Sequence, residues 1–103
     1  MVIYEVNLFV DKAVTSEYLH WLKPHIEEML RLPGFQAAKL FQVDQEQNRR
    51  TLWTIHYQVE SEQLLEEYFK SHADQMRKKA SDLFAGKFTA ERRILRPVDP
   101  GLL

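Results

Sequence analysis

Hydrophobic and polar residues alternate with two different periods along this chain, and the order of these periods predicts the fold. Four segments alternate residue by residue, as do strands that are covered on one face only. Two longer segments carry apolar residues three or four positions apart, which is the period of an amphipathic helix. In chain order, the predicted elements are strand Val2–Val10, helix Ser16–Leu32, strands Phe35–Val43 and Thr51–Val59, helix Ser61–Phe84 and strand Lys87–Arg96.

This order of elements predicts a ferredoxin-like α+β fold with a βαββαβ topology and a four-stranded antiparallel sheet. We expect one domain over residues 1–96, followed by a short tail over residues 97–103 that contains two prolines. In the usual arrangement the first and third strands lie side by side at the centre. Both helices cover the same face of the sheet, so the other face is left for a partner or a ligand.

The predicted helix ends depend on a few residues. Thr15 or Ser16 is a suitable N-cap for the first helix, and Ser61 for the second. Pro24 lies inside the first helix, where we expect a kink rather than an end because the apolar stripe continues on both sides. The second helical segment is long, and residues 71–74 are expected to bend it or to split it in two.

The first strand has one face that is apolar along its whole length, except for one tyrosine hydroxyl. This face either packs under the helices or forms the core of a dimer, and periodicity does not distinguish the two. On the second strand, alternation places Phe35, Lys39 and Phe41 together on one face. The apolar face of the first strand consists of Val2, Tyr4, Val6, Leu8 and Val10.

Composition excludes several classes of function. The 103 residues carry a net charge of −1, so the chain has no electrostatic attraction for nucleic acid or an anionic membrane. No apolar run approaches the length of a membrane span, and the N-terminus lacks the basic region of a signal peptide, so a cytoplasmic protein is expected. Without cysteine there is no disulfide, thiolate nucleophile or iron–sulfur cluster. His25 and Glu28 do not have the spacing of a metal motif, so neither a metal nor another cofactor is predicted.

A polar set is predicted on the mixed face of the two central strands. Glu5 and Asn7 of the first strand would neighbour Thr54 and His56 of the third. A carboxylate, an amide and an imidazole together can bind a polar ligand and move a proton. Alternatively, these groups satisfy one another or meet water, as buried polar groups usually do.

A second set of candidates lies near the predicted helices. His25 and His72 are close to the apolar stripes of the two helices, where they either line the mouth of a pocket or belong to the core. The large aromatic residues Trp21, Trp53 and Tyr57 are able to wall a cavity for a planar ligand, and equally able to form an ordinary core or a dimer interface.

Several spaced segments resemble a single protein family. The chain is similar, from Met1 to Leu95, to a short, uncharacterised bacterial family classed as a domain of unknown function. That family in turn resembles the dimeric α/β-barrel superfamily, in which two ferredoxin-like subunits pack sheet against sheet. The resemblance therefore implies a homodimer. The matching segments are Ile3–Leu8, Trp21–Ile26 with Glu28–Leu30, Phe35–Leu40, Tyr57–Val59 with Ser61, His72–Ala73 with Met76–Arg77, and Lys87–Leu95.

The superfamily includes cofactor-independent monooxygenases and haem-degrading enzymes, and the resemblance bears on each of them. Asn7 falls where the haem-degrading branch keeps an asparagine. The tryptophan and the axial histidine of that branch fall at Val59 and Lys79 here, so the resemblance excludes haem degradation.

Two hypotheses for function follow. The first is a non-catalytic homodimer that binds a small apolar or aromatic molecule or serves a structural role. The second is a cofactor-independent monooxygenase or isomerase for a planar, electron-rich substrate. In this second case His56 or His72 would be the base and Asn7 the orienting amide. The walls of the pocket would be Trp21, Trp53 and Tyr57.

Overall fold

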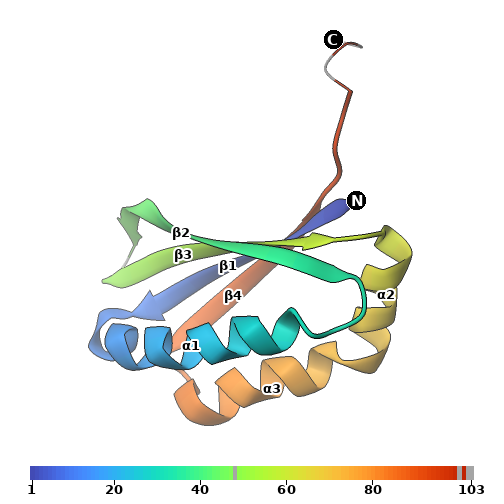
Figure 1. Ribbon diagram of the computed structural model, residues 1–103. Coiled ribbons are helices and arrows are strands. Elements are labelled where there is room, and N and C mark those ends of the chain that lie inside the picture. Colours follow the sequence, from blue (N-terminus) through green and yellow to red (C-terminus); the bar gives the residue numbers. More distant parts are fainter. Residues whose placement is uncertain (48, 100, 102–103) are drawn as a thin grey trace.

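The computed structural model describes residues 1–47, 49–99 and 101, and it folds into two layers, a sheet and a layer of helices (Figure 1). Four antiparallel strands form the sheet, and the three α-helices all lie against one of its faces, which confirms the predicted α+β architecture. The elements are β1 (Val2–Asp11), a 3₁₀ turn (Lys12–Val14), α1 (Thr15–Met29), β2 (Phe35–Gln47), β3 (Arg50–Val59), α2 (Glu62–Ser71), α3 (Ala73–Phe84) and β4 (Phe88–Leu95).

The strand order is β2-β3-β1-β4, so β1 and β3 are the central pair, as predicted. The register places Glu5 of β1 between His56 of β3 and Arg93 of β4. Asn7 lies opposite Thr54 on the same face. This register brings polar residues from three strands together near the middle of the sheet.

The predicted cap of α1 is wrong. The helix begins at Thr15, and Val14 occupies the cap position without a side-chain hydrogen bond. The hydroxyl of Thr15 instead donates backward to the carbonyl oxygen of Asp11, at 3.3 Å. The 3₁₀ turn before the helix explains this, because it leads the chain directly into the helix and is itself capped by the side chain of Asp11.

Three other predictions about the helices are confirmed, whereas the kink at Pro24 stays a prediction and α1 ends at Met29 rather than at Leu32. Ser61 caps α2, its hydroxyl oxygen accepting the backbone N–H of Leu64 at 3.2 Å. The long helical segment is split at His72, whose backbone (φ −132°) belongs to neither α2 nor α3. α1 runs through Pro24 without ending there.

The face assignment on β2 is wrong at one residue. A register shift between Phe35 and Ala37 turns Phe35 to the helix side, where it is buried. Beyond the shift, Lys39 pairs with His56 and Phe41 with Thr54, on the opposite face. A β-bulge adds one residue to one strand, and strict alternation cannot anticipate it.

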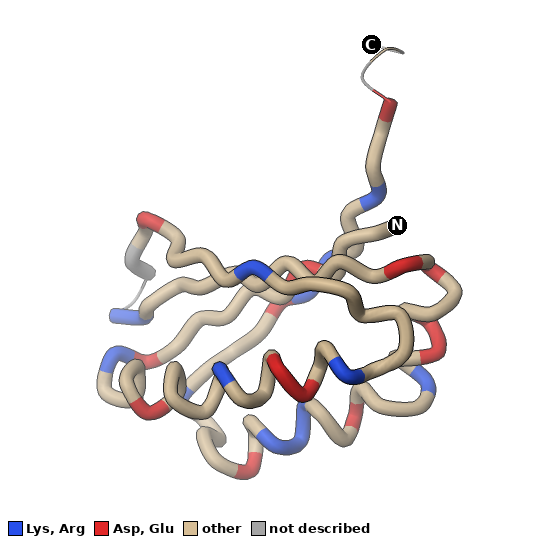
Figure 2. The backbone as a smooth tube through the Cα atoms, viewed as in Figure 1, with Lys and Arg blue, Asp and Glu red and all other residues tan. Residues whose placement is uncertain are grey.

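The core lies between the sheet and the helices, so the apolar face of β1 packs under the helices. Tyr4, Leu8 and Val10 are among its buried residues, and Leu22 of α1 and Leu65 of α2 meet them from the helix layer. Charged residues of both signs lie along the helices and at the ends of the strands (Figure 2). In the described part of the chain, no helix is long and apolar enough to cross a membrane.

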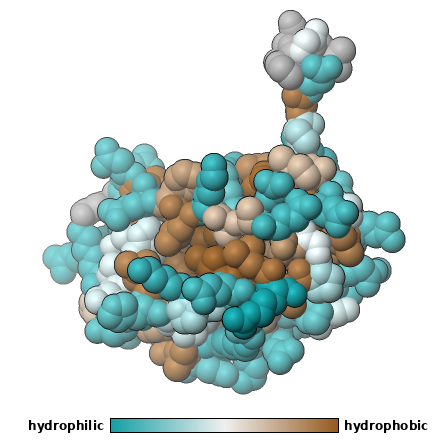
Figure 3. Space-filling model, viewed as in Figure 1, coloured by the Kyte–Doolittle hydropathy of each residue, from teal (hydrophilic) through white to brown (hydrophobic). Residues whose placement is uncertain are grey.

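Two features lie outside the packed core. Apolar side chains gather on the surface between β2 and α1 (Figure 3), and Leu40 of β2 is 38% exposed. After β4, the chain from Arg96 to Asp99 has no regular structure and extends away from the body on the side opposite the helices (Figure 1).

Candidate functional site

The sheet separates the predicted site residues into two groups. We call the face away from the helices the open face. A small cavity remains within the core between the sheet and the helices, and we call it the inner cavity. The open face carries Glu5, Asn7, Thr54 and His56. The helix side carries Trp21, His25, Trp53, Tyr57 and His72.

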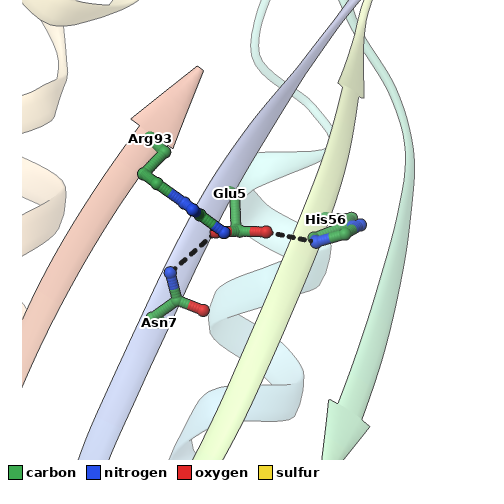
Figure 4. Close-up of polar contacts among 4 residues, drawn as sticks. All are labelled: Glu5, Asn7, His56 and Arg93. Atoms are coloured by element: carbon green, nitrogen blue, oxygen red, sulfur yellow. Dashed lines mark hydrogen bonds and ion pairs between the residues drawn. The ribbon is translucent and has the colours of Figure 1, made fainter. Parts of the chain in front are cut away.

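Glu5 is the centre of the polar cluster on the open face (Figure 4). Its side chain is only 7% exposed, and it makes three polar contacts. One carboxylate oxygen accepts from Asn7 Nδ2 at 2.8 Å and from Arg93 Nε at 2.6 Å. The other lies 2.8 Å from His56 Nε2. We call Glu5, Asn7, His56 and Arg93 the carboxylate cluster.

Hydrogen bonds and nearby charge keep the carboxyl group of Glu5 ionised. The hydrogen bond from Arg93 is the largest effect on Glu5; against the cost of burial, and with help from Asn7 and His56, it lowers the pKa of the carboxyl from 4.5 to about 2. A carboxylate only accepts hydrogen bonds, so Nε2 of His56 must carry the proton between the two groups. The four groups of the carboxylate cluster are thus engaged with one another, whereas the hydroxyl of Thr54 on the same face is buried without a partner in the described part of the chain.

Sequence reasoning did not include Arg93 in the site. The sequence contained part of the information, because alternation on the last strand puts Arg93 on one face with Glu91 and Leu95. The missing information was the register of β4 against β1, which sets Arg93 opposite Glu5.

Apolar residues flank the carboxylate cluster on the open face. Phe41 is 46% exposed and contacts the ring of His56 edge-on, with ring centroids 5.5 Å apart. An uncovered sheet face with exposed apolar residues is a candidate interaction surface. By register with Glu5, the other apolar residues of this face are Ile3, Phe9, Leu52 and Leu95.

The inner cavity has a volume of about 50 Å³, which is room for a few water-sized groups. Tyr57 lines it from the sheet, and Trp21 and His25 line it from α1. Trp53 is buried nearby and packs against Tyr18, with ring centroids 6.2 Å apart. Three of the predicted wall and pocket residues are therefore together here.

His25 is one of the polar groups of the inner cavity with an unmet hydrogen bond. Its ring stacks on Trp21, with centroids 4.5 Å apart, and its Nδ1 atom is buried without a partner in the described part of the chain. Burial lowers the pKa of His25 from 6.5 to about 4, so the imidazole is neutral at pH 7. An unsatisfied buried group costs about 1–3 kcal/mol, which a ligand or water atom would recover.

The tyrosines around the cavity are uncharged. Burial is the largest effect on Tyr18, Tyr57 and Tyr68, and it raises the pKa of each hydroxyl well above its usual value. The hydroxyl of Tyr4 accepts a hydrogen bond from Nη2 of Arg77 at 3.3 Å. The cavity therefore combines flat apolar walls with phenol groups and one neutral imidazole.

His72 is on the helix side but lies apart from the inner cavity. It stands between α2 and α3 and lines a separate surface pocket with Leu32, Leu64 and Tyr68. The described residues contain no group of three or more His, Asp or Glu side chains placed to hold a metal ion. Asn7 and His56 lie on the open face, whereas His72 lies between two helices on the other side of the sheet. One subunit therefore does not bring these three residues to a common point.

Solved structures with this fold include oxygenases. SnoaB, a cofactor-independent oxygenase from Streptomyces nogalater, is similar, with a TM-score of 0.68 and 13% identity over 95% of this chain and 94% of that chain. An antibiotic biosynthesis monooxygenase has a TM-score of 0.70 and 14% identity over 96% of this chain and 100% of that chain. A conserved protein from Methanosarcina mazei Go1 has a TM-score of 0.67 and 21% identity over 95% and 94%. These likenesses show the fold alone.

Sequence comparison gives the family. Among curated proteins, no sequence matches this chain. The profile of a family described as "Domain of unknown function (DUF4286)" matches residues 1–98, which include every strand and helix. The chain belongs to the DUF4286 family.

Proposed function

We propose that this domain is a homodimer that binds a small planar molecule at the inner cavity. The observation that carries this is the buried, unpartnered Nδ1 of His25 beside the ring of Trp21. A flat ligand with one hydrogen-bond donor would satisfy the nitrogen and pack against the aromatic walls. The small volume limits what enters without rearrangement to a compact part of the ligand.

The protonation states favour binding over catalysis. A general base works best with a pKa near the operating pH. The pKa of His25 is about 4 and that of Glu5 about 2, so both are weak bases at pH 7. His56 is engaged with Glu5 and lies across the sheet from the aromatic walls. One subunit therefore provides the aromatic walls that the monooxygenase hypothesis requires, but it does not place a suitable base beside them.

The open face supports the dimer. Its apolar flanks and exposed Phe41 would be covered by a second copy, sheet against sheet, as the resemblance to the dimeric α/β-barrel superfamily implies. Because the carboxylate cluster is already internally bonded, covering it would leave few polar groups without partners. The two faces would then have separate roles, assembly on one and binding on the other.

A matched pair of alanine variants tests the binding site. Ala80 lines the inner cavity, whereas Ala73 is equally buried but does not. Ala80→Val fills the cavity and should abolish binding of indole, followed by methyl NMR shifts of the full chain. Ala73→Val should leave indole binding intact. Equal binding by both variants, or no indole binding by the unmodified protein, would refute the proposed function.

A further inference from the structure

A second cleft lies between β4 and the α2–α3 layer, and we call it the arginine cleft. Its volume is about 360 Å³, several times that of the inner cavity. Four of its seven lining residues are arginines and none is acidic. The lining residues are Tyr4, Phe69, Arg77, Arg92, Arg93, Ile94 and Arg96.

Two of these four charges are neutralised within the chain. Arg93 donates to Glu5 at 2.6 Å, and Nε of Arg96 lies 3.0 Å from both carboxylate oxygens of Glu62. Over residues 1–47, 49–99 and 101, no carboxylate forms an ion pair with Arg77 or Arg92. The cleft therefore holds two arginines that form no ion pair with a described carboxylate, although the charge of Asp74 acts on Arg77 without contact.

Arg77 is prepared to bind an additional acceptor. Its side chain is half-buried, Nη2 donates to the hydroxyl of Tyr4, and Nε is buried without a partner in the described part of the chain. A guanidinium has five N–H donors in a planar fork that matches an oxyanion. Leaving one of them buried and unpaired is unfavourable, so an oxyanion here would restore a lost hydrogen bond.

Arg92 lines the same cleft as Arg77, from the strand. It pairs in register with Val6, which places it on the helix side of β4. Burial is the main cause that raises the pKa of Tyr68, and the charges of Arg77 and Arg92 both oppose it. Both guanidiniums are therefore close enough to act on the same hydroxyl, and their charges converge on one region.

The arginine cleft and the inner cavity share a wall. Tyr4, Arg77 and Arg92 line both of them. A molecule in the cleft would thus touch the same residues as one in the cavity, with Phe69 and Ile94 as apolar contacts for a ring.

We propose that the ligand is an organic oxyanion, such as an aromatic carboxylate or phosphate, whose acid group is held by Arg77 and Arg92. Its flat part points past the shared wall toward the inner cavity, and this placement rests on the proposed function. Two convergent guanidiniums select for a charged head group over a neutral one. The aromatic and aliphatic lining selects for a small aromatic acid over a free inorganic ion.

Isoleucine methyl NMR of the full chain tests this, because Ile94 lines the cleft and Ile55 lines the inner cavity. The probes are benzoate, phenyl phosphate and the neutral benzyl alcohol. We expect one of the two anions to bind at least about tenfold more tightly than the alcohol and to shift both methyls. The anion that binds more tightly shows whether the site prefers a carboxylate or a phosphate.

Variants complete the test. Arg92→Met and Arg77→Met should each weaken anion binding about tenfold or more, whereas Arg31→Met, an exposed arginine on the turn after α1, should not. Arg92 is exposed, so its variant should fold even if Arg77→Met does not.

The outcomes separate the two proposals. If the alcohol binds as tightly as both anions, or if the arginine variants bind like the unmodified protein, the oxyanion inference is overturned while cavity binding stands. If an anion shifts Ile94 alone and depends on Arg92, the oxyanion site stands and binding at the inner cavity is refuted. No methyl shift with any probe would overturn both.

Discussion

The two faces of this sheet are built from alternate residues of the same strands, yet they treat their ionisable groups differently. The uncharged hydroxyl of Thr54, on the open face, is buried without a partner in the described part of the chain, but the ionisable groups there are paired. On the open face, Glu5 is buried and all its partners are in place. On the helix side, His25 and Arg77 each keep a buried nitrogen without a partner in the described part of the chain. Buried polar groups with hydrogen-bond partners stabilise the fold, whereas those without partners are candidate contacts for a ligand. This difference is the basis on which we propose assembly for one face and binding for the other.

The largest expected effect separates the packed side from the uncovered side. Leu22→Ala removes a side chain that is 1% exposed under the sheet, and it should lower the free energy of unfolding by about 3 kcal/mol. Leu40→Ala, on the exposed β2 margin, is the control and should cost less than about 1 kcal/mol. Chemical denaturation measures both, and equal losses would contradict the location of the core.

Charging the open face should break assembly. Phe41→Asp replaces an exposed ring and occurs twice in a symmetric dimer, so it should weaken dimerisation about a hundredfold. Sedimentation equilibrium measures the change. Leu83→Asp, at a more exposed position on α3, is the control and should leave the dimer intact. Loss of the dimer in both variants, or in neither, would remove the open face as the interface.

The carboxylate cluster should give the open face its own acid sensitivity. The folded pKa of Glu5 is about 2, below its ordinary 4.5, so its stabilisation is complete above pH 4.5 and is lost as the pH falls toward 2. Because Arg93 is largely exposed, we expect about 2 kcal/mol rather than the full shift. Glu5→Gln should remove this part of the pH profile and lower stability at pH 7. An unchanged profile between pH 4.5 and 2 would mean that the cluster does not form.

The helix side should respond to acid in a different range. The folded pKa of His25 is about 4 and its ordinary value 6.5, so the unfolded chain takes up the proton first and stability falls between pH 6.5 and 4. His25→Phe keeps the ring on Trp21 and removes the unmet nitrogen. It should abolish this step and stabilise the protein at pH 7 by about 1 kcal/mol. A loss of stability at pH 7 would show that Nδ1 has a partner.

Periodicity predicted the fold and half of the site for a physical reason. Side chains alternate strictly along a strand, so Glu5 and Asn7 had to share a face, and the usual order of strands brought Thr54 and His56 beside them. The helix break at His72 was also readable, because Ser71, His72 and Asp74 are weaker helix formers than the residues on either side.

The remaining features depend on distances that a sequence does not contain. The bulge beside Phe35 leaves no mark in the hydrophobic pattern. Arg93 meets Glu5 only through the register of β4, and Arg77 lines one cleft with Arg92 only through the way α3 lies on the sheet. The pairing of charged residues across elements is set by packing, and periodicity within one element does not reveal it.

One set of isoleucine methyl spectra tests the division between the faces most directly. Ile3 lies on the open face, whereas Ile55 lines the inner cavity. The full chain is diluted without ligand and then titrated with benzoate at constant protein concentration. Dilution should shift Ile3 and spare Ile55, and benzoate should shift Ile55 and spare Ile3. If benzoate moved Ile3 alone, or dilution moved Ile55 alone, the assignment of binding and assembly to opposite faces would be wrong.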